Sequence, residues 1–321
     1  MGANILDVLT IGDALITMNP MSNGPLRFVN SFERKVGGAE LNVAIGCSRL
    51  GLKTGWISRL GQDEFGRHIY SFARGEGIDV EHVKLVEGYP TSVYFKEILN
   101  GNRINSYYYR GNSPTETFDT TDIDEEYVKQ FKVIHISGVF SAIHKNNREI
   151  ILALLKIAKK NNVYVTLDPN IRLKLWSAEE ARNTLCSYLP YVDMIMMGEE
   201  EAETLFSTSK MDELTQLLEE TYSIKNFVLK RGSKGAVGYE DDQITSSPAL
   251  ENLEIVDEIG AGDAFASGYI YGIINGWTME KRLSFANSVA AFVLTVPGDN
   301  EGLPYMEDLE KFLGLKKDIQ R

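Results

Sequence analysis

The sequence predicts an α/β fold of the doubly wound class, in which a mostly parallel sheet is flanked by helices on both faces. Short apolar runs with the composition of buried parallel strands alternate with segments of helical periodicity. No low-complexity linker or internal repeat interrupts this alternation, so we expect a single main domain over residues 1–321. A content of 43% hydrophobic and 24% charged residues is that of an ordinary globular chain, long enough to bury a full core.

Six apolar runs are the candidate strands of this sheet. They are residues 5–11, 53–58, 133–137, 163–167, 194–197 and 227–229. Helices are expected between them. One over 40–50 ends before Gly51, a typical residue after a helix, and one over 147–160 ends in lysines that suit the negative end of the helix dipole. Ser177 and Glu180 have the spacing of a capping box and predict the start of a further helix.

One segment departs from the alternation of strands and helices. Residues 92–99 and 104–109 are β-rich, and Asn100-Gly101-Asn102 between them is a strong hairpin-turn signal. Because a hairpin is unstable alone, we expect the strands in 91–110 to join others from residues 15–36 in a small sheet over the main domain. Such a sheet can be a lid over a ligand, a contact between copies in a homo-oligomer, or both.

Charge and composition exclude several classes of protein. The net charge of -12 and the isoelectric point near 5.0 argue against a nucleic-acid partner or an anionic membrane surface. The sequence has no apolar run of spanning length and no basic leader at its start, so we expect a soluble, cytoplasmic protein. Cys47 and Cys186 lie far apart and the four histidines have no metal-ligand spacing, which favours structural thiols and surface histidines.

The most informative motif is Gly260-Ala261-Gly262-Asp263-Ala264-Phe265, which places two glycines and a carboxylate at the start of an apolar helix. Small residues let backbone N–H groups at a helix N-terminus approach an anion, and the helix dipole favours negative charge there. Asp263 would then lie beside the anion as a proton acceptor. Taken alone, the motif also fits a glycine turn before a buried helix. The sequence contains neither a Walker A loop nor a GxGxxG that opens the first βα unit.

This motif and three earlier stretches, at residues 37–44, 50–51 and 61–66, together with Val256-Asp257, resemble both signatures of the PfkB, or ribokinase-like, sugar kinases. The resemblance covers essentially the whole chain, and two signatures in the right order are far more specific than one. It implies a ribokinase-like fold with a small β-sheet lid and an ATP-dependent carbohydrate kinase.

A narrower resemblance concerns the sugar. Residues 168–172, Asp168-Pro169-Asn170-Ile171-Arg172, with Tyr108 and Arg110, look most like the 2-keto-3-deoxygluconate kinases. Fructokinases share the Asp-x-Asn-x-Arg pattern, so they stay an alternative.

The resemblance implies a role for each motif residue. Asp263 corresponds to the general base that removes a proton from the attacking hydroxyl, and the backbone N–H groups of Gly260, Ala261 and Gly262 correspond to an anion hole. In this family Mg²⁺ is held largely by phosphates and water near a glutamate, whose position Glu201 fills. An acidic helix start would look the same.

Contacts with ATP are implied at two further places. Lys230, Gly232 and Gly235 follow an apolar strand and correspond to the segment along the ATP phosphates, although a hairpin turn within 227–239 also explains them. Asn287 corresponds to the lining of the adenine pocket, although close helix packing through neighbouring alanines is an equally good explanation.

The expected sugar site differs from that of many neutral-sugar kinases in its charge. Those relatives carry an aspartate five residues after the glycine of the first strand, whereas Gly12 is followed by Thr17 at that distance. Loss of a carboxylate beside Arg110 and Arg172 would let the pocket attract an acid. The other implied sugar contacts are Gly38, Asn42, Tyr94, Tyr108, Asp168 and Asn170.

The sequence therefore predicts an ATP-dependent kinase that phosphorylates a primary hydroxyl of a sugar acid, with 2-keto-3-deoxygluconate as the first candidate. A fructokinase-like kinase of neutral sugars is the alternative. A non-catalytic, sugar-responsive regulator is a third reading, against which the retained Asp263 and motif glycines argue. ATP and Mg²⁺ are the expected cofactors. The need for a monovalent cation is left open, because Glu258-Ile259 replaces the paired threonines near that site in relatives.

Overall fold

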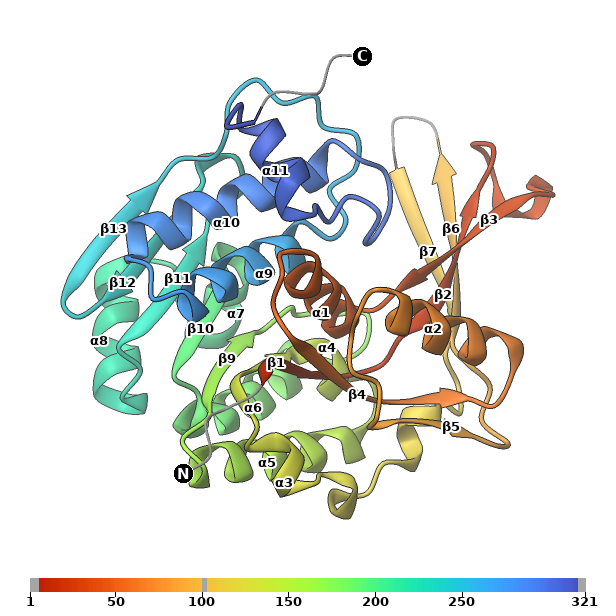
Figure 1. The fold of residues 1–321 in the computed structure, drawn as a ribbon, viewed down its shortest axis with the longest axis horizontal. Helices are drawn as coiled ribbons and strands as arrows, with labels where there is room; N and C mark the ends of the chain where they lie inside the picture. The colour runs from red at the N-terminus through yellow and green to blue at the C-terminus, as the bar shows by residue number, and fades with distance from the viewer. Residues whose placement is uncertain (1–5, 100–102, 317–321) are drawn as a thin grey trace.

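The structure is a computed structural model that describes residues 6–99 and 103–316. Within these residues a nine-stranded sheet of order β13-β12-β11-β10-β9-β8-β1-β4-β5 forms the centre, and a four-stranded sheet of order β3-β2-β6-β7 projects from it (Figure 1). Helices cover both faces of the large sheet (Figure 1). The predicted doubly wound α/β class is confirmed.

The large sheet is parallel except at one edge. Its strands are β1 (Leu6–Ile11), β4 (Thr54–Gly61), β5 (Val83–Val86), β8 (Phe131–Ser137), β9 (Tyr164–Asp168), β10 (Met194–Gly198), β11 (Asn226–Lys230), β12 (Ala236–Glu240) and β13 (Gln243–Ser247). Strands β12 and β13 are antiparallel to their neighbours. The six predicted strands are present, and β4 runs past its predicted end because Ser58 to Gly61 pair with β5, a strand that the sequence did not predict.

The helices lie between the strands and, for the last three, after β13 in the chain. They are α1 (Ala39–Arg49), α2 (Glu64–Gly75), α3 (Glu125–Val128), α4 (Gly138–Ile143), α5 (Lys145–Lys160), α6 (Ala178–Tyr188), α7 (Glu199–Phe206), α8 (Met211–Tyr222), α9 (Ala261–Ile274), α10 (Met279–Leu294) and α11 (Met306–Phe312). The capping box at the start of α6 is confirmed, because Ser177 Oγ accepts from the Glu180 N–H at 3.1 Å.

Side chains of β1 show why the sheet is covered on both sides. Leu9 and Ile11 point into a core shared with α5, α6, α7 and α8, whereas Val8 points into a core shared with α1, α9 and α10. Successive side chains of a strand face opposite ways, so a strand with apolar residues at every position must be buried on both faces. On the second face α9 and α10 approach closely, since a Cβ on Gly268 would lie 3.0 Å from the Ala286 Cα.

The small sheet contains the hairpin that the sequence predicted. Its strands are β2 (Leu15–Pro20), β3 (Phe32–Gly37), β6 (Val93–Leu99) and β7 (Arg103–Tyr109). Strands β6 and β7 pair antiparallel, with Val93 opposite Tyr109, and β2 pairs parallel to β6. The turn predicted at Asn100-Gly101-Asn102 lies outside the described residues. We call this four-stranded sheet the lid sheet; its role as a lid and the single-domain organisation stay predictions.

One expectation about the histidines is wrong. His135 is buried in β8, where its ring shares a hydrogen bond of 3.0 Å with the Thr166 hydroxyl, and burial lowers its pKa to about 4. A hydroxyl on the neighbouring strand satisfies the ring, which the spacing of histidines in the sequence could not reveal. Within the described ranges, no helix has the length and apolar character needed to cross a bilayer.

Candidate active site

The motif residues gather at the carboxyl edge of the parallel strands. Asp13 follows β1, Asp168 ends β9, Glu201 lies in the first turn of α7 after β10, and Lys230 ends β11. Neighbouring parallel strands all end at the same edge, which is where ligands bind in open α/β sheets. The start of α9, with Asp263, meets this edge, because Asp168 and Lys230 both act on the ionisation of the Asp263 carboxyl.

The N-terminus of α9 has the geometry that the motif predicted. Gly260 caps the helix with a φ of 80°, and a Cβ there would lie 2.4 Å from the Asp299 backbone oxygen, so only glycine fits. The first helical hydrogen bond is donated by the Ala264 N–H to Gly260 O at 2.8 Å. The Gly262 and Asp263 amides precede that bond, and such amides are available to an anion. A Cβ on Gly262 would have only the Lys230 ammonium near it, at 3.9 Å, so the start of α9 lies close to this cation.

Asp263 has the ionisation behaviour of a general base. Its carboxyl group is desolvated by the surrounding protein, which raises its pKa to about 7. Asn42 opposes this shift by donating a hydrogen bond from Nδ2 to Asp263 Oδ2 at 2.9 Å, while the nearby carboxylate of Asp168 adds to it. A base with a pKa near neutrality can both accept a proton and be regenerated at physiological pH.

Asp168, Lys230 and Glu201 form a charged cluster beside Asp263. Lys230 Nζ lies 2.6 Å from Asp168 Oδ2, and the attraction of Asp168 and Glu201 outweighs burial and raises the pKa of the lysine. Glu201 accepts N–H bonds from Gly198 at 2.7 Å and Ile171 at 3.0 Å, and burial raises the pKa of its carboxyl. Lys230 therefore reaches the centre of the site, where it is already paired with a carboxylate.

A magnesium ion at this cluster would need most of its ligands from elsewhere. Among residues 6–99 and 103–316, no group of three His, Cys, Asp or Glu side chains is arranged to hold a metal. Mg²⁺ commonly binds one or two carboxylates and completes its shell with phosphate oxygens and water. Glu201 fits the role of such a single carboxylate at the rim of a phosphate site.

Arg110 has a partner that the sequence analysis overlooked. Its Nη2 and Nε lie 2.9 and 3.0 Å from Oδ2 of Asp13, which is almost fully buried. The pocket therefore keeps a carboxylate even though Thr17 is not acidic. This corrects the expectation that a carboxylate had been lost, and Asp13, directly after Gly12 at the end of the first strand, was the available signal.

Arg172 is free where Arg110 is paired. The Arg172 side chain is exposed, and within the described part of the chain it has no hydrogen bond or ion pair. Burial raises the pKa of Asp263 and of Tyr94, and the charge of Arg172 opposes both shifts, so Arg172 lies within electrostatic range of both. Asn170 has a left-handed backbone with φ of 37°, and its N–H donates to Asp168 Oδ1 at 3.1 Å, which turns the chain toward Arg172.

The remaining predicted sugar contacts come from α1 and the lid sheet. Gly38 precedes α1 with a φ of 148°, and a Cβ there would lie 2.6 Å from the Asp13 backbone oxygen. Tyr94 and Tyr108 stack on one face of the lid sheet with ring centroids 5.1 Å apart. Tyr94 is buried and Tyr108 is half exposed, so the pair presents an aromatic surface next to Arg110.

The residues predicted to contact ATP also make structural contacts within the protein. The alternative explanation, a hairpin, is correct: β11 and β12 pair antiparallel and are joined by residues 231–235. Gly232 faces open space, whereas a Cβ on Gly235 would lie 2.1 Å from the Ser247 backbone oxygen. Asn287 donates from Nδ2 to Ser247 O at 3.1 Å and to Pro248 O at 3.0 Å, so it anchors the end of β13. Their contacts with ATP stay predictions.

The sequence analysis also missed two polar residues that support the site. Glu40 is fully buried in α1, accepts the Phe140 N–H at 3.1 Å, and has its pKa raised to about 8 by burial. Asn300 donates from Nδ2 to the Val36 backbone oxygen at 2.7 Å and lies 3.4 Å from Asn42 Oδ1. Glu40 lies inside the quoted motif and could have been singled out, whereas Asn300 carries no sequence signal.

Known proteins resemble this chain along its whole length. Residues 6–306 match the family described as pfkB family carbohydrate kinase. A 5-dehydro-2-deoxygluconokinase from Clostridium perfringens is 31% identical over 318 residues, which cover 97% of this chain and 94% of that protein. A 2-dehydro-3-deoxygluconokinase from Thermoproteus tenax is 30% identical over 313 residues, covering 96% and 94%. The crystal structure of 2-dehydro-3-deoxygluconokinase from Thermotoga maritima has a TM-score of 0.87 at 25% identity, covering 98% of this chain and 100% of that one.

The chain belongs to the pfkB family of carbohydrate kinases. It is therefore an ATP-dependent sugar kinase with a ribokinase-like fold, as its two signatures predicted.

Replacing the candidate base tests its role directly. Asp263→Asn keeps the size of the side chain and removes the proton acceptor, so turnover should fall by about 10²–10⁴-fold, the usual worth of general-base assistance. Steady-state kinetics, the melting temperature and the dissociation constant for ATP should be measured together. Retention of about a third of normal turnover would contradict the assignment.

The pH dependence of turnover tests the environment of the same carboxyl. Asp263 must be ionised to accept a proton, so kcat of the natural protein should fall as the pH drops through about 7. Asn42→Ala removes a hydrogen bond that favours the charged form, so the acidic limb of the profile should move to higher pH. The control is Asn226→Ala, which removes a buried amide in β11. An acidic limb that stays in place in Asn42→Ala counts against Asp263 as the titrating base.

Proposed function

We propose that this protein phosphorylates the primary hydroxyl of a sugar acid, with 2-keto-3-deoxygluconate as the first substrate and its 6-phosphate as the product. The observation that carries the proposal is Arg172, a guanidinium close to Asp263 with no partner among residues 6–99 and 103–316. An arginine pairs with a carboxylate through two parallel hydrogen bonds, and this one is free to do so. Arg110 contributes less than expected, because Asp13 offsets its charge.

The mechanism that the site supports needs no covalent enzyme intermediate. The sugar hydroxyl lies beside Asp263, which accepts its proton as the oxygen attacks the γ-phosphorus of ATP. The amides at the start of α9 face the phosphoryl group and offset its negative charge, and Lys230 adds a positive charge next to Gly262. Glu201, with Asp168 nearby, would hold Mg²⁺ through a carboxylate, and the ion would neutralise charge on the ATP phosphates.

The relatives support a sugar acid and name two of them. Both 2-dehydro-3-deoxygluconate and 5-dehydro-2-deoxygluconate carry a carboxylate at one end and a primary hydroxyl at the other, and they differ in the positions of the keto and methylene groups. Clostridial relatives of similar identity are named for the second acid. A substrate panel must therefore contain both acids. A fructokinase-like activity is the alternative, because Asp168 and Asn170 also occur in the pattern of those enzymes.

The wider setting follows from this activity. ATP and Mg²⁺ are the proposed cofactors. The proposed location is the cytoplasm, where ATP is available. A potassium requirement is left open, because Glu258 and Ile259 replace the paired threonines of relatives that have a monovalent-cation site. A homo-oligomer through the lid sheet is supported by Ile104, Tyr107 and Tyr109, which are 44%, 45% and 67% exposed on β7.

Replacing Arg172 tests the recognition of a carboxylate. Charge-assisted pairs are worth about 1.5–3 kcal/mol, so Arg172→Leu should raise the Michaelis constant for a keto-deoxy sugar acid by about 10–100-fold. Activity on fructose, which the proposal expects to be low, should hardly change. Lys174→Leu, which removes another exposed cation two residues away, is the matched control. If the natural protein phosphorylates fructose at least as well as either acid, the sugar-acid proposal is wrong and the fructokinase alternative replaces it.

Substrate binding should also protect the lid sheet. If β6 and β7 cover the sugar through Tyr94 and Tyr108, their amides should exchange with solvent more slowly when the sugar acid is bound. Hydrogen exchange with and without substrate measures this, and amides of α8 serve as the internal reference. Unchanged exchange in β6 and β7 at saturating substrate would assign these strands to a static interface.

A further inference from the structure

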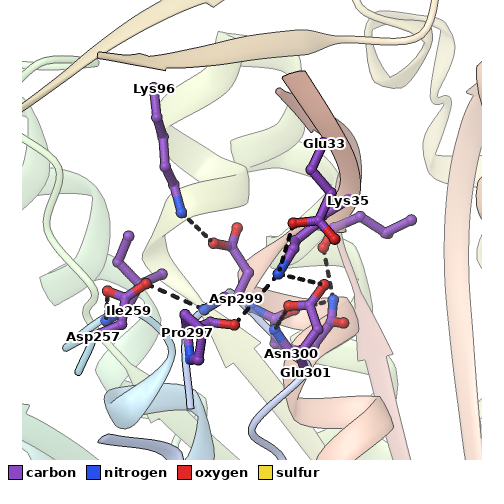
Figure 2. Close-up of polar contacts among 12 residues, drawn as sticks. Glu33, Lys35, Lys96, Asp257, Ile259, Pro297, Asp299, Asn300 and Glu301 are labelled. Carbon is purple, nitrogen blue, oxygen red and sulfur yellow. Dashed lines mark hydrogen bonds and ion pairs between the residues drawn. The ribbon is translucent and has the colours of Figure 1, made fainter. Parts of the chain in front are cut away.

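A short loop between α10 and α11 touches both the lid sheet and the start of α9. On the lid side, Lys35 Nζ lies 3.4 Å from the Pro297 backbone oxygen (Figure 2). On the other side, the Gly298 N–H donates to Asp257 Oδ2 at 3.2 Å, and Asp257 Oδ1 accepts the Ile259 N–H at 3.1 Å. We call residues 297–301 the bridging loop.

The bridging loop also fixes the position of the helix N-terminus. The backbone oxygen of Asp299 lies only 2.4 Å from the position that a Cβ on Gly260 would take, so the loop packs directly against this glycine. Asn300 lies 3.4 Å from Asn42, and Asn42 in turn donates to Asp263 at 2.9 Å. A shift of the loop would therefore reach both the amides that face the phosphoryl group and the carboxyl of the base.

One buried ion pair joins this loop to the lid sheet. Lys96, on β6, places Nζ 3.1 Å from Asp299 Oδ1, and the two side chains are only 5% and 10% exposed (Figure 2). The second oxygen, Oδ2, lies against Gly37 of β3, 2.5 Å from where a Cβ would stand. A larger residue at position 37 would displace the carboxylate, so the packing of two lid strands sets where Asp299 can be.

Lys96 also shares a face of the lid sheet with the predicted sugar contacts. It is two residues after Tyr94 on the same strand, and its ammonium lies 5.9 Å from the centre of the Tyr94 ring. The ion pair therefore lies beside the aromatic surface of Tyr94 and Tyr108, on the same face of the lid sheet. Any movement of β6 that accompanies sugar binding must be carried to Asp299, because breaking a buried ion pair leaves an unpaired charge.

We propose that the buried ion pair of Lys96 with Asp299 couples the lid sheet to the start of α9, so that Lys96 is a positioning residue for phosphoryl transfer that acts through Asp299. The pair holds the bridging loop against Gly260 when β6 is in place. Sugar contacts on the lid sheet and alignment of the anion-binding amides then depend on each other. The inference rests on the proposed roles of Gly260 to Asp263, but not on which sugar is the substrate.

The central experiment compares kcat with KM in Lys96→Met, which keeps the apolar length of the side chain and removes its charge. Misplacement of reacting groups by about 1 Å can cost about 10²-fold in rate, so we expect kcat to fall by about 10–100-fold. The KM for sugar should change by less than about threefold, since direct sugar contacts remain. The sugar used is the one that the natural protein phosphorylates best, so a wrong substrate proposal does not affect the result.

Asp299→Asn and the double variant complete the comparison. If the two residues act as one unit, each single variant should lower kcat to a similar degree and the double variant should be no worse than either. Hydrogen exchange at the start of α9 supplies a readout independent of turnover, because the amides of residues 260–264 should exchange faster in Lys96→Met. Additive losses in kcat would show that the two residues act separately and would overturn the proposal.

Arg59→Met is the matched control for loss of a buried cation. Arg59, on β4, pairs with Asp122 at 2.6 Å with 5% of its side chain exposed, and its partner is not in the bridging loop. Arg59→Met should lose stability while kcat stays within about twofold of normal, because its ion pair does not reach the bridging loop. An equal loss of kcat in both variants would mean that any broken buried ion pair lowers turnover, and the coupling would be rejected.

Chemical rescue separates positioning from a purely structural effect. In Lys96→Ala, added methylammonium or ethylammonium can occupy the space of the missing side chain and pair with Asp299. Recovery of kcat by about tenfold or more, with neutral alcohols of the same size without effect, supports the coupling. A folded Lys96→Met variant with normal kcat, or one with only a raised KM for sugar, would overturn it. If Asp263→Asn instead keeps full turnover, the proposed catalytic role of Asp263 is wrong, and this result is independent of the Lys96 variants.

Discussion

The site depends on a carboxylate that is kept out of water beside the start of a helix. Burial raises the pKa of Asp263 to about 7, and the Asn42 hydrogen bond limits the shift. A fully hydrated aspartate would be ionised but a poor base near neutral pH. The cost of this desolvation is shared by the surrounding cations, since a buried charge must be paired or bonded. Arg172 and Lys230 are the cations that act on the Asp263 carboxyl, and Lys230 is itself paired with Asp168.

Acidic groups outnumber cations around the site, which agrees with a chain whose net charge is -12. Asp13 and Glu40 are almost completely buried near Asp263, and burial raises the pKa of both. Arg110 offsets the first of these carboxylates, so its charge is largely used within the protein. Arg172 is exposed and has no side-chain partner among the described residues. The two arginines therefore differ in their surroundings: Arg110 is paired within the protein, whereas Arg172 is open to solvent.

Among the described residues, three ion pairs join the lid sheet to the rest of the protein; the pair of Lys35 with Glu301 is partly exposed, and the other two are largely buried. Arg110, directly after β7, reaches Asp13 after β1, and Lys96 on β6 reaches Asp299 in the bridging loop. Both pairs are largely buried, so they hold defined geometry rather than adding much stability. The lid sheet is thereby tied to the loop after β1 by one pair and to the bridging loop by the other. Because the sheet is attached at both places, a ligand that changes the position of the lid sheet at one attachment can also change the other.

The order of apolar runs and the motif residues 260–265 were enough to predict the parallel sheet, the hairpin of the lid sheet and the position of Asp263 at a helix start. These features are local: they depend on periodicity, on turn-forming residues and on glycine at positions that tolerate no side chain. The sequence also predicted that the hairpin joins strands from residues 15–36, but it did not predict which particular side chains pair across the chain. The partner of Arg110 was mistaken, His135 was expected at the surface, and Asn300 and the ion pair of Lys96 with Asp299 were not foreseen. Such contacts join residues far apart in the chain, and a lysine in a strand looks the same whether it faces water or a buried aspartate. Only the packing of the lid sheet against the bridging loop decides which of the two it meets.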